Sequence, residues 1–268
     1  MPEGHTLHRL ARLHQRRYGG APVRASSPQG KFAPDASIVD GQVLVKAEAY
    51  GKHLFHSYPV GTVHVHLGLY GTFTEAKLPA LPPVGQVRMR IVGSTHWTDL
   101  RGPNRCELLT PDQVDAIKAR LGPDPLRRDA RPDRAYERIS ASRTSLAALL
   151  MDQSVLAGVG NVYRAEVLFR HGIAPMLPGR SLDPVLWKEI WGDLVTLMRA
   201  GVRTGRIDTV AGEHLPEVTG RAPRQDRHGG EVYVYRRTGQ PCLVCGTPVA
   251  HKELAGRNLY WCPTCQPA

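Results

Sequence analysis

Hydrophobic residues near the start of the chain recur with the period of an α-helix. The face that a helix over 5–17 would bury holds Leu7, Leu10, Ala11 and His14. Such a helix would hold the N-terminal residues at a fixed place on a core.

Between Val43 and Leu100 the pattern changes to an alternation of apolar and polar residues. The runs QVLVKAEAY, HLFHSY, TVHVHLGLYGTF and QVRMRIV are separated by Gly and Pro, which is typical of strands joined by turns. This part of the chain is predicted to be an antiparallel β-sandwich or barrel. Thr110 as N-cap and Pro111 in the first turn predict a closing helix that stops at Gly122.

Helical periods return after a stretch, 122–134, that is rich in proline and charge and is predicted to be an interdomain linker. The elements predicted beyond it are helices over 144–153, 161–171 and 183–202, a long polar loop over 205–230, and a last strand, EVYVYRR, over 231–237.

These patterns predict an α+β protein with two main parts. We expect an N-terminal antiparallel β-sandwich with flanking helices, and a C-terminal helical domain that ends in a β-hairpin. A chain of 268 residues is long enough to bury both cores. The expected boundaries are 1–121 for the sandwich, 122–134 for the linker, 135–230 for the helical domain and 231–268 for the hairpin segment.

Four of the five cysteines stand near the C-terminus with the spacing of a metal site. They form two C-x-x-C pairs separated by 16 residues, and a hairpin over 246–261 would bring four thiolates around one tetrahedral zinc ion. Four thiolates leave no open position for a catalytic water, so we expect one structural Zn²⁺. The ligands are Cys242, Cys245, Cys262 and Cys265. Only Cys106 lies outside this set, which favours a reducing compartment over disulfides.

The charge of the chain narrows its partners. Thirty-five basic and 24 acidic residues give a formal charge of +11 and a pI of about 9.7. This favours an anionic partner such as nucleic acid, with a membrane surface as the other explanation. No stretch approaches the roughly 18 consecutive apolar residues of a membrane-spanning helix, and the start MPEGHTLHRL lacks the apolar core of a signal peptide. We therefore expect a soluble cytoplasmic protein.

Pro2 has a chemistry that no internal proline has. Once Met1 is removed, its nitrogen is a secondary amine that could attack the electrophilic C1′ of a nucleotide and expel the base. The pKa of an α-amino group is about 7.7–8.0, and a cationic DNA-binding surface favours the neutral, nucleophilic form. Glu3, one residue away, can supply or relay protons. Taken alone, however, Met-Pro-Glu also fits a start that only permits methionine removal.

Five segments together resemble the formamidopyrimidine-DNA glycosylase and endonuclease VIII family over nearly the whole chain. They are Met-Pro-Glu-Gly at the start, Gly51-Lys52-His53, Leu69-Tyr70, Gly158-Val159-Gly160-Asn161, and the zinc hairpin with Arg257. The start resembles the endonuclease VIII branch, whose preference is for oxidised pyrimidines. The resemblance implies a helix-two-turns-helix motif and a bifunctional DNA glycosylase and abasic-site lyase of base excision repair. Its implied partner is damaged double-stranded DNA.

The resemblance also implies roles for four catalytic residues. Pro2 would form a covalent iminium with the sugar, and Glu3 would be the general acid. Lys52 would reach the sugar or phosphate and assist the first, β, elimination, whereas Arg257 would clamp phosphates and assist the second, δ, elimination. Without the resemblance, Lys52 fits a solvated turn lysine and Arg257 a hairpin surface charge.

Four further residues are expected to contact DNA: Gly68, Leu69, Tyr70 and Asn161. Leu69 or Tyr70 would fill the gap left by a flipped-out nucleotide, the alternative being ordinary core packing. Asn161 would contact a phosphate, cap the helix that it begins, or do both. Familiar endonuclease VIII members carry Gln where this chain has Gly68, and a second acidic residue where it has Thr6, so those two roles do not transfer.

Two alternatives to the endonuclease VIII interpretation stay open. One is a glycosylase of the formamidopyrimidine branch, which removes oxidised purines, and the other is a zinc-bearing DNA-binding protein without catalysis. In the glycosylase, the loop over 205–230 would shape the base pocket. We expect a monomer that acts at the bacterial nucleoid. No metal is expected at His53, His56, His64 or His66, because His64 and His66 lack an obvious carboxylate partner in the sequence.

Overall fold

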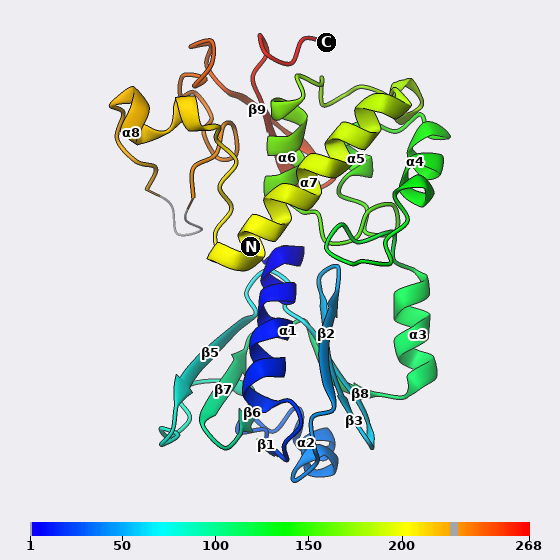
Figure 1. Ribbon diagram of the computed structural model, residues 1–268, viewed down its shortest axis with the longest axis vertical. Helices are drawn as coiled ribbons and strands as arrows, with labels where there is room; N and C mark the ends of the chain where they lie inside the picture. Colours follow the sequence, from blue (N-terminus) through cyan, green and yellow to red (C-terminus); the bar gives the residue numbers. More distant parts are fainter. Residues whose placement is uncertain (1, 226–229) are drawn as a thin grey trace. The chain divides into compact units, whose positions relative to one another are not determined.

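The computed structural model describes residues 2–225 and 230–268. The chain divides into two compact units, one ending at Arg120 and the other beginning at Leu121 (Figure 1). Each unit has its own hydrophobic core. Within the described residues, no helix is both long enough and apolar enough to cross a membrane.

Two antiparallel four-stranded sheets form the first unit. Their strand orders are β1-β6-β7-β5 and β2-β3-β4-β8. The strands are β1 (Arg24–Ser26), β2 (Lys46–Tyr50), β3 (His53–Tyr58), β4 (Gly61–His66), β5 (Thr72–Lys77), β6 (Val87–Val92), β7 (His96–Arg101) and β8 (Arg105–Leu109). The helices are α1 (Gly4–Tyr18), α2 (Ala33–Val39) and α3 (Pro111–Ala119). The predicted antiparallel sandwich with flanking helices is confirmed.

Alternating side chains of the strands and one face of α1 fill the core of this unit. Leu54, Val65 and Leu100 are fully buried or nearly so, and Leu7 of α1 joins the same cluster. Helix α1 packs against β2 and β3. Its buried face therefore follows from the helical period of the first residues, as the sequence predicts.

Helix α3 begins as predicted but ends earlier. The backbone N–H of Gln113 donates to the Thr110 hydroxyl and that of Thr110 donates to the Gln113 side chain, which forms a capping box. The helix stops at Ala119, so Gly122 is not its terminator. Gly122 instead packs against the second unit's own backbone, where an added Cβ would lie 2.3 Å from the carbonyl oxygen of Val155.

Helix α6 (Asn161–Arg170) lies at the centre of the second unit and is buried along nearly its whole length. Around it are α4 (Pro132–Ser140), α5 (Leu146–Leu149), η1 (Gly179–Ser181), α7 (Pro184–Thr204), η2 (Gly212–His214), α8 (Pro216–Thr219), β9 (Ala250–Leu254) and β10 (Arg257–Trp261). The helices predicted over 161–171 and 183–202 are present with ends shifted by one or two residues. Only four residues of the helix predicted over 144–153 are helical.

The segment predicted to be a linker, 122–134, is not a free connection. Residues 121–125 are buried in the second unit, and α4 begins at Pro132. The lack of a helical or strand period in this stretch reflects irregular packed backbone rather than exposure to solvent.

The strand predicted over 231–237 is wrong. The backbone N–H groups of Tyr233, Val234 and Tyr235 donate to the carboxylate of Glu166 at 2.7–2.9 Å instead of to a neighbouring strand. The Thr209 hydroxyl donates to the same carboxylate at 2.6 Å. The apolar side chains of this segment are buried nonetheless, so their pattern reported burial and not sheet pairing.

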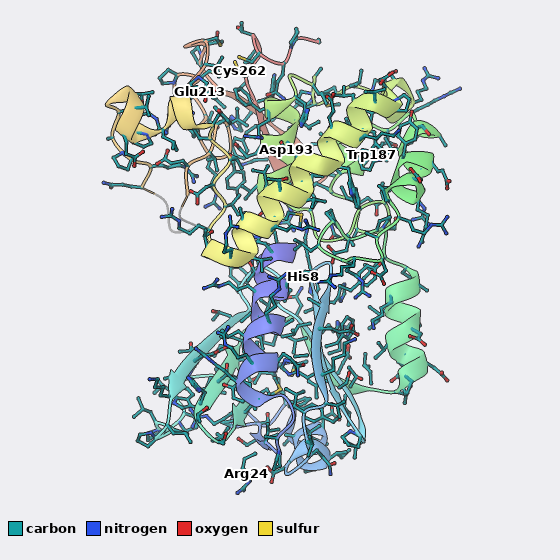
Figure 2. The ribbon with its side chains drawn as sticks, in the orientation of Figure 1. His8, Arg24, Trp187, Asp193, Glu213 and Cys262 are labelled. Carbon is teal, nitrogen blue, oxygen red and sulfur yellow. The ribbon has the colours of Figure 1, made fainter. Side chains whose placement is uncertain are left out.

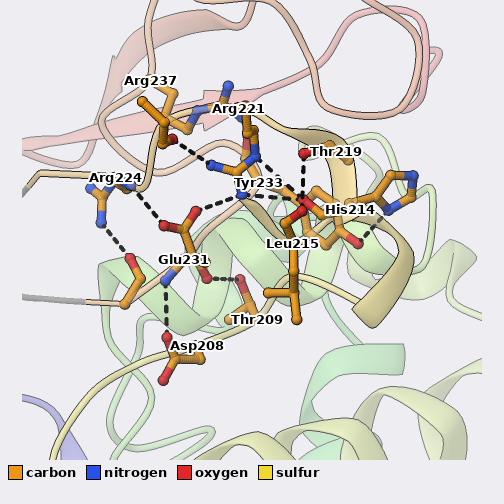
Figure 3. Close-up of polar contacts among 12 residues, drawn as sticks. Asp208, Thr209, His214, Leu215, Thr219, Arg221, Arg224, Glu231, Tyr233 and Arg237 are labelled. Atoms are coloured by element: carbon orange, nitrogen blue, oxygen red, sulfur yellow. Dashed lines mark hydrogen bonds and ion pairs between the residues drawn. The ribbon is translucent and has the colours of Figure 1, made fainter. Parts of the chain in front are cut away.

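The predicted polar loop over 205–230 contains two short helices, η2 and α8, and its positions 226–229 lie outside the described residues. Figure 3 shows how Glu231 ties this loop together. Its carboxylate accepts from the Arg221 guanidinium at 2.6 Å and from the Arg224 backbone N–H at 2.7 Å. The Glu231 N–H donates to Asp208 at 3.0 Å.

Candidate active site and zinc hairpin

The first residues of α1 hold the two N-terminal candidates in a partly enclosed place. Glu3 is fully buried and stands at the N-cap position, with its carbonyl accepting from the Thr6 N–H at 2.9 Å. Pro2, before it, is half-buried. Burial lowers the pKa of His5 to about 4, so a neutral imidazole lies in the same helical turn.

Lys52 lies in the two-residue turn between β2 and β3. The strands pair up to Tyr50 and His53, which leaves Gly51 and Lys52 to reverse the chain. Gly51 has a φ of +55°, a conformation that glycine adopts without a steric cost. The turn therefore presents a half-buried lysine from a rigid hairpin.

Hydrogen bonds fix the direction of α1 against β2. The Ala47 N–H donates to the Gln15 side chain at 2.6 Å, and the Gly20 N–H donates to the Leu44 carbonyl at 2.8 Å, so the helix and the strand are antiparallel. From the Gln15 contact, Glu3 lies roughly 18 Å along the helix and Lys52 roughly 16 Å along the strand in the same direction. Pro2, Glu3 and Lys52 therefore lie at the same end of the first unit.

The Leu69–Tyr70 turn lies at this end too. Strand β4 ends at His66, which pairs with His53 at the start of β3. The Gly71 N–H then closes the turn by donating to the Leu67 carbonyl at 2.9 Å. Leu69 is 44% exposed and Tyr70 is 83% exposed, which rules out core packing as their role. An exposed apolar pair on a tight turn has the form of a wedge that can enter a base stack.

A chain of hydrogen bonds joins His53, His64 and Glu107 across β3, β4 and β8. His53 Nδ1 lies 2.8 Å from His64 Nε2, and His64 Nδ1 lies 3.1 Å from Glu107. Glu107 is thus the carboxylate partner of His64 that the sequence did not reveal, because it comes from β8. Burial and the neighbouring His64 lower the pKa of His53 to about 3. His53 and His64 are therefore neutral near pH 7. Their contact links β3, which follows the Lys52 turn, to β4.

The four cysteines of the second unit converge as their spacing predicts. Their sulfur atoms all lie within 4.8 Å of one another. Cys242 and Cys265 are 3.8 Å apart, and Cys245 and Cys262, the last labelled in Figure 2, are 3.5 Å apart. Tetrahedral zinc with Zn–S bonds of about 2.3 Å places its sulfurs about 3.8 Å apart. The four side chains therefore fit one structural Zn²⁺.

Arg257 flanks the turn of the β9–β10 hairpin. Ala255 and Gly256 form this turn with φ values of +50° and +70°, and Arg257 pairs with Leu254. The next residue on β10, Asn258, is fixed to α6, because its carbonyl accepts from the Asn161 side chain at 2.9 Å. The hairpin that the zinc closes thus brings Asn161 and Arg257 into one region of the second unit.

Asn161 does not cap α6. Gly160 is the N-cap residue, and the Asn161 side chain is buried between Asn258 and the guanidinium of Arg164, which donates to its Oδ1. Arg164 also donates to the Ala147 carbonyl at 3.3 Å. The capping alternative is therefore wrong, and the contact between Asn161 and DNA stays a prediction.

Sequence reasoning missed Glu166. It is the one acidic residue of a helix that is buried on every side, and a buried carboxylate requires several hydrogen-bond donors. An acid inside NVYRAEVLFR was the available signal. Its partners, more than 40 residues away in the chain, carried none.

Comparison with known proteins adds three family models, which together match most of the chain. The models are the formamidopyrimidine-DNA glycosylase N-terminal domain over residues 1–106, the formamidopyrimidine-DNA glycosylase H2TH domain over 121–211, and the zinc finger found in FPG and IleRS over 239–268. The fold and these matches define the chain as a DNA glycosylase by class.

Individual relatives give the family. "Endonuclease 8 1" of Mycobacterium tuberculosis (strain H37Rv) is 57% identical over 99% of this chain and 100% of its own length. Formamidopyrimidine-DNA glycosylase of Synechococcus sp. is 33% identical over 78% of this chain and 74% of its own. The solved structure of MutM (FPG) from Thermus thermophilus superimposes with a TM-score of 0.76 at 26% identity, covering 99% of this chain and 98% of that chain. The chain belongs to the formamidopyrimidine-DNA glycosylase and endonuclease 8 family, whose members are DNA glycosylases and abasic-site lyases.

Proposed function

We propose that this protein removes oxidised pyrimidines from damaged double-stranded DNA and then cuts the strand at the abasic site, in base excision repair. One observation supports this above the others. The antiparallel packing of α1 on β2 takes Pro2, Glu3 and Lys52 to the end of the unit where Leu69 and Tyr70 are exposed. This end of the first unit thus combines a candidate nucleophile, an acid, a cationic side chain and an exposed apolar turn that can enter a base stack.

The chemistry begins at the Pro2 nitrogen. Its lone pair forms a bond to C1′ while the bond from C1′ to the base breaks, and the base leaves with a proton. Glu3 protonates the ring oxygen O4′, so that the C1′–O4′ bond opens and the nitrogen, having lost its own proton, becomes an iminium. The buried position of Glu3 limits competition from water for this transfer.

Strand cleavage follows from the iminium. Loss of a C2′ proton expels the 3′ phosphate in the β-elimination, and a further proton loss expels the 5′ phosphate in the δ-elimination. Lys52 is assigned to the first step and Arg257 to the second, because both carry positive charge that stabilises a phosphate leaving group. Water then hydrolyses the remaining iminium, which releases the sugar fragment as an aldehyde and restores the Pro2 amine.

Gly68, Leu69, Tyr70 and Asn161 are assigned to DNA contacts in this proposal. The exposed Leu69 and Tyr70 would enter the stack, which offsets the few kcal/mol that base flipping costs. The zinc has no chemical step. Bound by the four cysteines, it would hold the β9–β10 hairpin and with it Arg257.

The choice of lesion rests on the relatives. The 57% identity to an endonuclease 8 exceeds the 33% identity to a formamidopyrimidine-DNA glycosylase. This favours pyrimidine lesions over the purine lesions of the alternative branch. Action at the bacterial nucleoid, as a monomer, is part of the same proposal.

Borohydride trapping tests the reaction directly. Reduction should fix a covalent adduct between the protein and a duplex that contains thymine glycol. Pro2→Gly should lower the yield of this adduct, because glycine replaces the ring-constrained secondary amine by a flexible primary amine that reacts less readily. Intact-mass measurement must first show that Met1 is absent, since otherwise the Pro2 nitrogen is an amide. An adduct only with 8-oxoguanine duplexes would assign the chain to the purine branch. No adduct with any lesion or abasic duplex would leave a non-catalytic DNA-binding protein.

A further inference from the structure

The connection between β5 and β6 is an exposed segment that is rich in proline. Its sequence over 78–86 is LPALPPVGQ, and each of these residues is exposed. Leu81 is 63% exposed and Val84 is 75% exposed. Strands β5 and β6 pair with β7 on its two sides, so the segment, which we call the strap, crosses over β7.

The strap crosses the face of this sheet that is directed away from the core. Met89, Ile91 and Leu100 belong to the core cluster, so the residues that alternate with them on β6 and β7 lie on the other face. On that face Arg90 is paired across the strands with Asp99, and its guanidinium donates to both carboxylate oxygens at 2.6 and 2.8 Å. Asp99 is nonetheless fully buried.

Two arginines on this face hold the strap. Arg90 donates to the Leu81 carbonyl at 2.7 Å. Arg101 donates to the Val84 carbonyl at 3.0 Å and to the Asp99 carboxylate at 2.9 Å. One buried carboxylate therefore orients both guanidinium groups, and a further N–H of each group fixes the backbone of the strap.

The spacing of these two contacts is that of a polyproline II helix. This helix has three residues per turn, so carbonyls three residues apart face the same way and are separated by about 9 Å. The two bonded carbonyls are three residues apart, and the arginines that bind them, one strand and two residues from each other, are roughly 8 Å apart. Pro79, Pro82 and Pro83 also fix φ near the value that this helix requires. The strap is therefore held in the conformation of proline-rich recognition segments.

We propose that the strap is a docking surface for a partner protein whose groove is lined by aromatic side chains and has an acidic rim. Grooves lined by aromatic residues bind P-x-x-P segments in the polyproline II conformation, and Pro79 and Pro82 have this spacing. Between Ala76 and Arg90 every charged side chain is a cation. Lys77, directly before the strap, is exposed, and its charge is complementary to an acidic rim.

The anchored strap should bind more tightly than a free chain of the same sequence. Ordering a flexible segment on binding costs free energy, and the arginine contacts have already ordered the strap. The folded protein should therefore bind such a groove about 3- to 10-fold more tightly than a synthetic peptide of residues 76–86.

An SH3 domain with acidic residues at the rim of its groove is the probe, because its aromatic groove has the required chemistry. Titration of the ¹⁵N-labelled domain with the full-length protein should shift the signals of the groove. Pro82→Ala should weaken binding at least about 5-fold. Pro59→Ala is the matched control, since Pro59 is exposed in the turn between β3 and β4, and it should leave binding unchanged.

Charge reversal gives a second, independent variant. Lys77→Glu should weaken binding about 3-fold at low salt and less at about 1 M salt, because salt screens exposed charges. Circular dichroism and zinc content of each variant are measured alongside, so that a folding defect is seen separately.

Three results would overturn the proposal. In the first, the free peptide binds the domain and the folded protein does not, which would mean that the sheet covers the recognised edges of the strap. In the second, Pro82→Ala and Lys77→Glu both bind as tightly as the wild type. In the third, an excess of undamaged duplex DNA displaces the domain, which would assign the strap to nucleic-acid binding instead.

Discussion

The β2–β3 and β9–β10 hairpins each position a basic side chain, but they are stabilised in different ways. Each reverses the chain in a two-residue turn and presents a basic residue, Lys52 within the first turn and Arg257 directly after the second. Strand β3 is paired on both sides inside a four-stranded sheet, and its Leu54 is fully buried. Strands β9 and β10 pair only with each other.

A hairpin of two strands is marginally stable in water, so the second one needs other support. Leu259 of β10 is buried in the core of its unit, and the cysteine cluster closes the base of the hairpin. The contrast teaches that the first cation is positioned by a sheet, whereas the second is positioned by a short hairpin that combines core packing with a metal site.

Loss of a zinc ligand should give the largest difference between the two hairpins, because only the β9–β10 hairpin depends on the cysteines. Cys262→Ser should release zinc and unfold the β9–β10 hairpin, because metal binding and folding are coupled in such segments. Strand cleavage should fall at least about 100-fold, equivalent to about 2.7 kcal/mol. Zinc analysis and hydrogen exchange over 239–268 measure the change. Cys106→Ser is the matched control and should keep zinc and activity. Protected amides over 250–261 in Cys262→Ser would contradict the contrast.

Glu166→Gln should weaken the second unit without touching the first. The variant replaces a carboxylate that accepts four hydrogen bonds by an amide whose NH₂ would face backbone donors. We expect the free energy of unfolding of this unit to fall by about 2–4 kcal/mol. Urea unfolding followed by Trp fluorescence reports it, since Trp187 and Trp191 lie in this unit. The exposed Glu137→Gln should change it by less than about 0.5 kcal/mol.

Low pH should lower the free energy of unfolding of the first unit through a histidine of the β2–β3 hairpin. His56 of β3 is fully buried, and burial together with the nearby His14 holds its pKa well below the usual value. The unfolded chain binds this proton below about pH 6.5 and the folded chain does not, so stability is lost as pH falls toward the folded pKa. One such histidine costs about 2 kcal/mol at pH 5.

Urea unfolding at pH 7 and pH 5 checks this loss by comparing wild type with His56→Gln, which retains a polar partner for His14. The difference between the two pH values should be smaller in the variant by about 2 kcal/mol. An identical pH dependence would mean that His56 is protonated in the folded protein.

The turn residues should give the smallest effects, of opposite sign. Gly51→Ala forces a Cβ into a left-handed conformation and should cost about 1–2 kcal/mol. Ala255→Gly relieves the same strain at a φ of +50° and should gain about 0.5–1 kcal/mol. Thermal unfolding of the two variants checks both signs. A loss in Ala255→Gly would show that the zinc hairpin carries no strain at its turn.

Local signals in the sequence predicted what depends on local physics. The period of α1, the capping box at Thr110 and the cysteine spacing each involve residues close in sequence or a fixed ligand chemistry. The strand predicted over 231–237 was wrong because the backbone N–H groups of this segment donate to the Glu166 carboxylate and not to a neighbouring strand. The bond from Tyr233 to Glu166 joins residues 67 positions apart in the chain. No period encodes such a partner.

The candidate site divides in the same way. The amine chemistry of Pro2 and the acid chemistry of Glu3 could be predicted from residue type. Their common location with Lys52 could not, because it depends on the antiparallel contact between Gln15 and Ala47. The packing of Asn104 on Gly68 was also hidden, since it needs two separate turns to meet.

Helix α1 fixes the distance between the contact of Gln15 with β2 and the N-terminal residues Pro2 and Glu3. Inserting or deleting one residue between the two would move Pro2 by about 1.5 Å and rotate it by about 100° around the helix axis. Loops of this protein can change length during evolution at little thermodynamic cost, but this helix cannot. Descendants of this chain are therefore expected to keep the number of residues between Pro2 and Gln15 fixed even where the residues themselves change.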